Sequence, residues 1–209
     1  MDFNDLAKTA GDACYVFLTL NFCWGLYHIV MGFRRVKELN FDSHDEQDEY
    51  LQEVTEPLRA KRYDDAEALV ADDARALPQL THLAIVNREL SGDQLRQVIT
   101  EVVQRDVIGD LEYQANWVAT VIKSGPLLGL FGTVLGMMAA FGRIGTGEKV
   151  QPSQIAAEIS IALICTAMGL MTAIPFNFML ASLNVRIRSF QDSLGAGLVR
   201  VLDLLKARS

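Results

Sequence analysis

The sequence predicts an all-α membrane protein with three transmembrane helices and long helical extensions outside the membrane. Half of the 209 residues are hydrophobic, at 50%, and the net charge is -7. The charged side chains nevertheless avoid three long windows, except for Lys123 and Glu158 near the window ends. Outside the windows, apolar side chains recur every three or four positions, which is typical of amphipathic helices. No phosphate loop, nucleophile triad or basic nucleic-acid patch occurs, so the sequence favours neither an enzyme nor a nucleic-acid-binding protein.

The three windows are residues 13–33, 118–141 and 155–183. At about 1.5 Å per residue, each helix is long enough to cross roughly 30 Å of hydrocarbon. The first window is interpreted as a retained anchor and not as a signal peptide. Its lead-in contains aspartates and a single Lys8, and no small-x-small cleavage site precedes the basic run that follows it.

The distribution of lysine and arginine predicts the orientation. Basic residues gather on the cytoplasmic side of membrane proteins. This rule places residues 34–117 and the amphipathic tail 184–209 in the cytoplasm, and residues 1–12 and the short loop 142–154 in the periplasm. The cytoplasmic side receives Arg34, Arg35, Lys37, Arg105, Lys123, Arg186 and Arg188, and the periplasmic side receives Lys8, Arg143 and Lys149.

The region between the first two windows is predicted to be helical. Ser91 and Gln94 have the spacing of a capping box, in front of an apolar stripe with a period of 3.6. Since no proline occurs between Pro78 and Pro126, this helix is expected to continue unbroken into the second span, for a total of about 70 Å. The stripe consists of Leu95, Val98, Ile99, Val102 and Val103.

Two further helical segments are predicted outside the membrane. A short helix over residues 64–70 is expected to end before Leu77-Pro78. After the third window, apolar residues at intervals of three and four predict an amphipathic tail that packs on the other extramembrane helices. These tail residues are Ile187, Phe190, Leu194, Leu198, Val201 and Leu205.

The second span carries glycines that a water-soluble helix would avoid. In lipid the helix keeps its internal hydrogen bonds, and glycines on one face allow another backbone to approach closely. Thr133 adds a hydroxyl beside this stripe, as on a face that lines a seam or a narrow pore. The stripe is formed by Gly125, Gly129, Gly132 and Gly136.

Two motifs in the second and third spans closely resemble the signature of the MotA/TolQ/ExbB proton-channel family. The first is Gly-Pro-Leu-Leu-Gly-Leu-Phe-Gly-Thr-Val-Leu-Gly-Met at residues 125–137. The second is Ala-Leu-Ile-Cys-Thr-Ala-Met-Gly-Leu-Met-Thr-Ala-Ile-Pro at residues 162–175. The weaker segment at residues 62–68 resembles the alanine-rich cytoplasmic helix of that family. Three spans place the resemblance in the ExbB/TolQ branch, because MotA-type proteins have four.

The resemblance implies a subunit of a bacterial inner-membrane transducer driven by the proton-motive force. Five copies would form a ring that contacts membrane lipid. The second and third spans of each copy would enclose two single-span ExbD/TolR-like partners. The partner's membrane aspartate would carry protons, and the motion would pass to a TonB- or TolA-like periplasmic protein. No cofactor or metal is implied. Within the motifs, Gly169, Pro126 and Pro175 are assigned, with the four stripe glycines, to helix packing.

The residues of the ion pathway are predicted to be Thr133, Thr166 and Glu158. The two threonines match the family's pore threonines, although a hydroxyl inside a membrane helix can also be satisfied by a backbone carbonyl one turn back. Many relatives carry a glutamate five residues before the third-span threonine, where this chain has Ile161. Either Glu158, about one turn nearer the outer mouth, replaces part of that function, or it is a helix-start acid that complements the helix dipole.

Other polar residues are interpreted as structural. Cys14, Cys23 and Cys165 lack metal-ligand spacing and are expected to be free thiols. His28 is interpreted as an interfacial belt residue in preference to a proton relay. The acidic run at residues 42–49 is interpreted as a solvated face and not as a cation-gathering site.

Two functions therefore remain open for this chain: a proton-driven motor subunit, and a membrane scaffold or assembly protein with the same packing that conducts nothing. The Ile161 substitution keeps the second open. The sequence does not distinguish proton from sodium, or a TonB-type from a Tol-type or a specialised motor client, and it does not fix the size of the ring.

Overall fold

The computed structural model describes residues 3–71, 73–145 and 151–206. Throughout these ranges the chain forms helices joined by turns, with no strand among them, so the predicted all-α class is confirmed. Three stretches are long and apolar enough to cross a membrane: Ala13–Arg59, Gly92–Gly142 and Pro152–Lys206. Each contains one predicted window. Part of the predicted loop 142–154, including Lys149, lies outside the described residues.

The helices differ in length, and three of them are much longer than the predicted spans. The elements are α1 (Phe3–Leu39), α2 (His44–Arg59), α3 (Tyr63–Val70), α4 (Ala76–Val86), α5 (Gly92–Val102), the π-helical turn η1 (Val103–Ile108), α6 (Gly109–Gly145) and α7 (Pro152–Lys206). The third span and the amphipathic tail thus form one helix. The chain divides into two compact units, a membrane unit and a polar unit.

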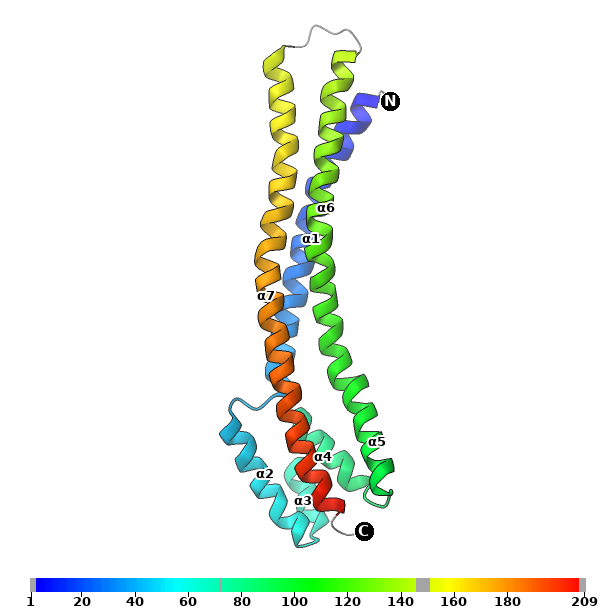
Figure 1. The fold of residues 1–209 in the computed structure, drawn as a ribbon, viewed down its shortest axis with the longest axis vertical. Helices are drawn as coiled ribbons and strands as arrows, with labels where there is room; N and C mark the ends of the chain where they lie inside the picture. Colours follow the sequence, from blue (N-terminus) through cyan, green and yellow to red (C-terminus); the bar gives the residue numbers. More distant parts are fainter. Residues whose placement is uncertain (1–2, 72, 146–150, 207–209) are drawn as a thin grey trace. The chain divides into compact units, whose positions relative to one another are not determined.

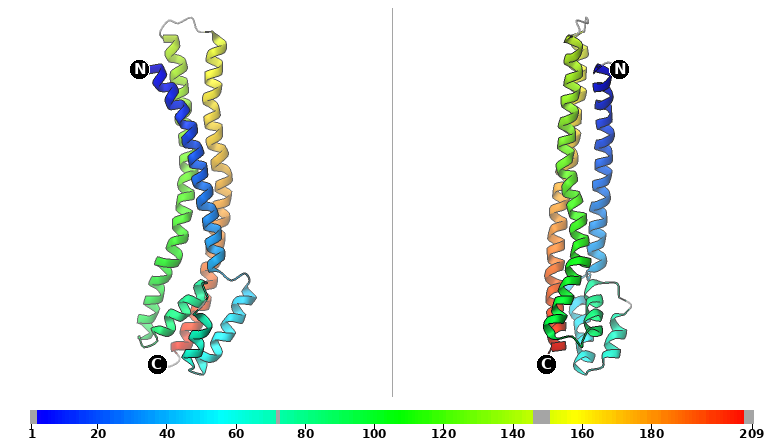
Figure 2. Two further views of the ribbon diagram at one scale, coloured as in Figure 1. Left: turned by 180° about the vertical axis from the view of Figure 1, so that it is seen from behind. Right: turned by 90° about the vertical axis from the view of Figure 1, so that its right-hand side faces the viewer.

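The membrane unit comprises the described parts of residues 1–30 and 115–182. In it α1, α6 and α7 run side by side, and α1 lies against the seam between α6 and α7 (Figure 1, Figure 2). Its buried positions include many small residues, such as Cys14, Ala140, Ala162 and Cys165, while large apolar residues such as Leu127 and Met171 face outward. This pattern suits a surface covered by lipid or other membrane helices.

The polar unit comprises the described parts of residues 31–114 and 183–209. Its helices α2, α3 and α4 cluster beside the last turns of α7 (Figure 1). Its core is made mainly of large aliphatic and aromatic side chains, with a few alanines, as in a water-soluble domain. The most buried of these include Val54, Val70, Ile85, Ile99, Leu111, Leu183 and Phe190.

The acidic run lies on the outer face of α2. Ser43 caps this helix, because its hydroxyl accepts a hydrogen bond from the Glu46 backbone N–H at 3.1 Å. Asp45, Asp48 and Glu49 are exposed. The opposite face buries Tyr50, Leu51, Val54 and Leu58.

Arg75 joins two helices of the polar unit. Its guanidinium donates to Asp73 Oδ2 at 2.6 Å and to Glu46 Oε1 at 2.6 Å. It also lies 4.0 Å from the ring centroid of Phe41, a cation–π distance. The side-chain hydrogen bonds from Arg75 lower the pKa of Asp73 below its ordinary value. The start of α4 is thereby tied to the start of α2, which the sequence did not predict.

The helix leading into the second span is continuous, with one departure from the prediction. The predicted capping box at Ser91 and Gln94 is present. The six residues of η1, however, are π-helical. Ile99 and Val107 are both buried although they are eight residues apart. In a regular α-helix, residues at this spacing point in directions that differ by about 80°. The wider π turn brings the two residues back toward one face.

The amphipathic tail is confirmed. Ile187, Phe190, Leu194, Leu198 and Val201 are buried, and Leu205 is half-buried. Helix α3 also matches the short helix predicted over residues 64–70. Helix α4 was not predicted: Leu77-Pro78 lies in its first turn, where proline is tolerated.

Candidate ion-pathway seam

The backbones of α6 and α7 touch at the stripe glycines. A Cβ on Gly129 would lie 2.7 Å from the carbonyl oxygen of Cys165 and 2.9 Å from the Cα of Thr166. A Cβ on Gly169 would lie 2.5 Å from the carbonyl oxygen of Gly125 and 3.2 Å from the Cα of Pro126. Neither position has room for a side chain, so the helices meet glycine against backbone from both sides.

The other stripe glycines extend this contact. A Cβ on Gly136 would lie 2.5 Å from the Cβ of Ala162, and one on Gly132 would lie 3.0 Å from the Cβ of Cys165. Pro126 and Pro175 both lie inside their helices, where each removes one backbone donor. Pro175 is exposed.

The two predicted pathway threonines face each other across this seam. Thr133 Oγ1 and Thr166 Oγ1 are 2.5 Å apart. The Thr133 hydroxyl lies 2.9 Å from the carbonyl oxygen of Ala162 and 3.1 Å from that of Gly129. The Thr166 hydroxyl lies 3.1 Å from the same Gly129 oxygen. The close backbone contact is what brings the two side chains together.

A hydroxyl has one proton to donate and lone pairs with which to accept. Both threonine protons can be donated within the chain, to the carbonyl oxygens of Gly129 and Ala162 or to the other threonine's hydroxyl. What remains on the two hydroxyls is the ability to accept further hydrogen bonds. Thr133 is 7% exposed, whereas Thr166 is half-buried. The pair can therefore accept a hydrogen bond from water or from a protonated carboxyl group, but it carries no ionisable proton at neutral pH.

Glu158 and Ile161 differ in their surroundings. Glu158 is half-buried, while the Ile161 side chain is 54% exposed. The Tyr15 hydroxyl on α1 donates to the Ile161 carbonyl oxygen at 2.7 Å. Tyr15 was not predicted as part of the site, and its place in an apolar window was the available signal. The α7 backbone just before the threonine thus receives hydroxyl groups from both neighbouring helices.

A second unpredicted polar pair joins α1 to α6. The Asn21 amide donates to the Ser124 hydroxyl at 2.6 Å. Thr172 on α7 lies nearby, since its Cβ is 3.9 Å from the point that a Gly125 Cβ would occupy. Asn21 and Ser124 are polar residues inside apolar windows, so their isolation in the sequence was a usable signal.

His28 differs from its prediction as a belt residue. It is only 3% exposed and stacks on Trp117, with ring centroids 5.6 Å apart. Trp24 packs edge-on against it. Trp24 and Tyr27 are about half exposed, so they present the amphipathic surface of a belt, and His28 lies behind them.

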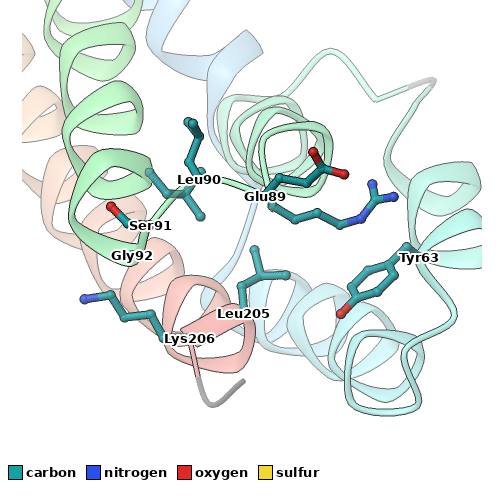
Figure 3. Close-up of a pocket in the computed structure, with 9 residues that line it drawn as sticks. Tyr63, Glu89, Leu90, Ser91, Gly92, Leu205 and Lys206 are labelled. Carbon is teal, nitrogen blue, oxygen red and sulfur yellow. The ribbon is translucent and has the colours of Figure 1, made fainter. Parts of the chain in front are cut away.

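The described side chains include no group of three or more His, Cys, Asp or Glu residues that could hold a metal ion. A pocket of about 670 Å³ lies in the polar unit, between the start of α3, the start of α5 and the end of α7. Tyr63 and Lys206 lie on opposite sides of it (Figure 3). None of the predicted pathway residues lines this pocket.

A profile of the MotA/TolQ/ExbB proton channel family matches residues 68–195, more than half of the chain, and covers the whole seam. The chain belongs to this family. The resemblance read from the two motifs is thereby confirmed.

Curated relatives place the chain in the ExbB/TolQ branch. It is 36% identical over 88 residues to the Tol-Pal system protein TolQ of Haemophilus influenzae, covering 42% of this chain and 39% of that protein. It is 31% identical over 132 residues to the biopolymer transport protein ExbB of Neisseria gonorrhoeae, covering 61% of this chain and 52% of that protein. It is 43% identical over 65 residues to TolQ of Pseudomonas aeruginosa, covering 31% of this chain and 28% of that protein. The chain thus spans about half or less of these relatives' length.

Family membership and the three apolar helices together assign the chain to the inner membrane as a multi-pass protein of a proton-channel family. The side of the membrane on which each terminus lies stays a prediction.

Proposed function

We propose that this chain is the ring-forming subunit of an inner-membrane transducer driven by the proton-motive force, with α6 and α7 lining a pore around a single-span ExbD/TolR-like partner. The threonine pair at the α6–α7 seam is the observation that carries the proposal. It offers hydrogen-bond acceptors and no proton carrier, which is the chemistry a pore wall needs if the carrier belongs to another chain.

The charge distribution supports this division of labour. An ionisable group in the middle of a span costs several kcal/mol and is retained mainly for function. In the windows of the second and third spans, Lys123 and Glu158 are the charged residues, and both lie near the ends. The carrier is therefore assigned to an aspartate of the partner, whose protonated form can donate to Thr133 or Thr166. The partner would in turn act on a TonB- or TolA-like protein.

Glu158 is proposed to hold water or a cation near the outer mouth. It lies two turns before Thr166 on α7 and is half-buried, so a carboxylate there retains partial access to solvent. The helix-dipole role remains the competing explanation, because Glu158 is in the second turn after the start of α7.

Two observations favour the scaffold function. Both threonine protons are accommodated within the chain, and the position that carries a glutamate in many relatives is an exposed isoleucine. A protein that kept the glycine packing but conducts nothing would have the same seam.

Proton flux into vesicles separates the two functions. The chain would be reconstituted alone, with its single-span partner, and with a partner whose membrane aspartate is changed to asparagine. The motor function predicts flux only with the unmodified partner. A complex that assembles but conducts no protons under a membrane potential would support the scaffold function. Flux that depends on sodium would identify sodium, and not the proton, as the transported ion.

A further inference from the structure

Cys14 and Cys165 meet at one point in the membrane unit. Both are free thiols and both are buried, at 3% and 2% exposure. They lie on different helices, α1 and α7, and both are next to Gly132 of α6. A Cβ on Gly132 would be 3.0 Å from the Cβ of Cys165, 3.1 Å from its sulfur and 3.3 Å from the Cβ of Cys14.

The contacts at Gly132 limit how far apart the two cysteines are. Cβ atoms that lie 3.0 Å and 3.3 Å from one point are separated by no more than the sum of those distances, about 6.3 Å. A disulfide requires a Cβ–Cβ separation of about 3.5–4.5 Å. The Cys165 sulfur lies 3.1 Å from the position that a Gly132 Cβ would occupy, and each sulfur can move by rotation about its Cα–Cβ bond. The missing Gly132 side chain leaves the space in which the sulfurs can meet.

We propose that Cys14 and Cys165 are a redox-active pair whose disulfide ties α1 to α7 beside the threonine seam. One S–S bond forms while two S–H bonds break. The two electrons and two protons pass to a lipid-soluble two-electron oxidant, such as a membrane quinone, which leaves as the quinol. Reduction by a dithiol reverses the step, with two electrons and two protons returned to the sulfurs.

The position of the pair gives the bond a consequence. Cys165 precedes Thr166, and Gly132 precedes Thr133, so the bond would fix α1 to the turn of α7 that carries the pathway hydroxyl. Any movement of α7 against α1 during the cycle would stop. This regulatory part rests on the proposed function, whereas formation of the bond does not.

The third cysteine supplies a matched control. Cys23 is on α1 as well but is exposed. Membranes containing the full chain would be treated with diamide, a permeant oxidant that accepts two hydrogen atoms. The protein would then be denatured, alkylated and weighed by intact mass spectrometry. The expected product is a monomer with one internal disulfide and one alkylated cysteine.

Serine variants assign the bond. Cys23→Ser is expected to keep the disulfide, and Cys14→Ser and Cys165→Ser are each expected to lose it. Gly132→Ala places a methyl group 3.1 Å from the Cys165 sulfur and 3.3 Å from the Cys14 Cβ. It should slow formation of the disulfide about tenfold, since the disulfide geometry is strict. The proposed Cys14–Cys165 disulfide would be refuted by three alkylated cysteines in the oxidised unmodified chain, or by a disulfide that survives in Cys14→Ser.

Proton flux tests the regulatory part. In vesicles with the single-span partner, oxidation is expected to stop flux, dithiothreitol to restore it, and Cys14→Ser to be insensitive to both. Full flux in the oxidised, disulfide-bonded complex would contradict the proposal that the disulfide stops the movement of α7 against α1. Absence of flux in the reduced complex would instead count against the proposed function and leave the disulfide result standing.

Discussion

The membrane unit and the polar unit are stabilised by different kinds of contact. In the membrane unit, glycines let backbones touch, and hydroxyl groups of one helix bond to carbonyls of the next. In the polar unit, large side chains such as Phe190 and Leu183 fill a core, and Arg75 ties helices through charge. In lipid the hydrophobic effect does not favour helix association, so close van der Waals contact and hydrogen bonds between helices must stabilise it. In water, burial of large apolar surface is itself stabilising. The two units should therefore respond to opposite substitutions.

Enlarging a stripe glycine is expected to have the largest effect. Gly136→Leu and Gly132→Leu would drive a side chain into α7, where a Cβ alone lies 2.5 Å from Ala162 in the first case and 3.0 Å from Cys165 in the second. Assembly should be lost while membrane insertion is kept. Gly195→Leu in the polar unit is the matched control, since no atom outside its own turn of helix lies within 4 Å of its Cβ position. Native mass spectrometry of the extracted complex decides it, and intact oligomers in both stripe variants would refute the packing argument.

Truncating a large side chain should affect the polar unit instead. Phe190→Ala removes a ring that is 2% exposed and should cost about 3–5 kcal/mol. Val199→Ala, at a position 50% exposed on the same helix, should cost little. Hydrogen exchange of the full chain measures both. Comparable protection of the polar unit in Phe190→Ala and the unmodified chain would show that this core does not depend on side-chain volume.

Alkaline pH should also act on the polar unit. Burial raises the pKa of Tyr50 to about 12, against the smaller lowering effects of Thr81 and Arg75. The phenol of an unfolded chain ionises near pH 10, so unfolding releases a proton between about pH 10 and 12 and is favoured as the pH rises. The loss should reach roughly 2–3 kcal/mol at the upper end.

Tyr50→Phe should remove this part of the alkaline destabilisation, and Tyr113→Phe, at a position 54% exposed, should not. Hydrogen exchange across this pH range gives the comparison. An alkaline response unchanged by Tyr50→Phe would mean that Tyr50 does not govern it.

A smaller effect is expected at Glu158. If its carboxylate holds water or a cation near the pore mouth, Glu158→Gln should slow proton flux several-fold and Glu158→Asp should be tolerated. If it acts only on the helix dipole, the glutamine variant should lose a few tenths to about 1 kcal/mol of stability with flux unchanged. Equal flux for Glu158→Gln and the unmodified chain would exclude the pathway role.

The sequence predicted the features that depend on local pattern. Hydropathy placed the three windows, and the spacing of Ser91 and Gln94 predicted a cap that is present. The tail stripe through Phe190 and Leu194 was predicted for the same reason. These features need only neighbouring residues along one helix.

The features that were missed depend on pairs that are distant in sequence. Arg75 reaches Glu46 across two helices, and Tyr15 reaches the carbonyl of Ile161. Cys14 meets Cys165 only because Gly132 leaves room. The π turn was also not predicted. It brings the apolar residues before and after it onto one face of the helix, and that face is defined only by the packing of the folded chain.

The hydroxyls of Thr133 and Thr166 are proposed to serve ion transfer and not packing alone. The most direct measurement is proton flux through the complex with its single-span partner. It compares the double variant Thr133→Val/Thr166→Val with Thr120→Val, an exposed α6 threonine whose hydroxyl donates to the Asn116 carbonyl one turn back. Valine keeps the shape and removes the polar group. We expect an intact assembly in both proteins, with flux lowered roughly tenfold or more in the double variant alone, as the loss of two hydrogen bonds would produce. Unchanged flux in the double variant, or collapse of its assembly, would contradict the claim and assign the pair to structure.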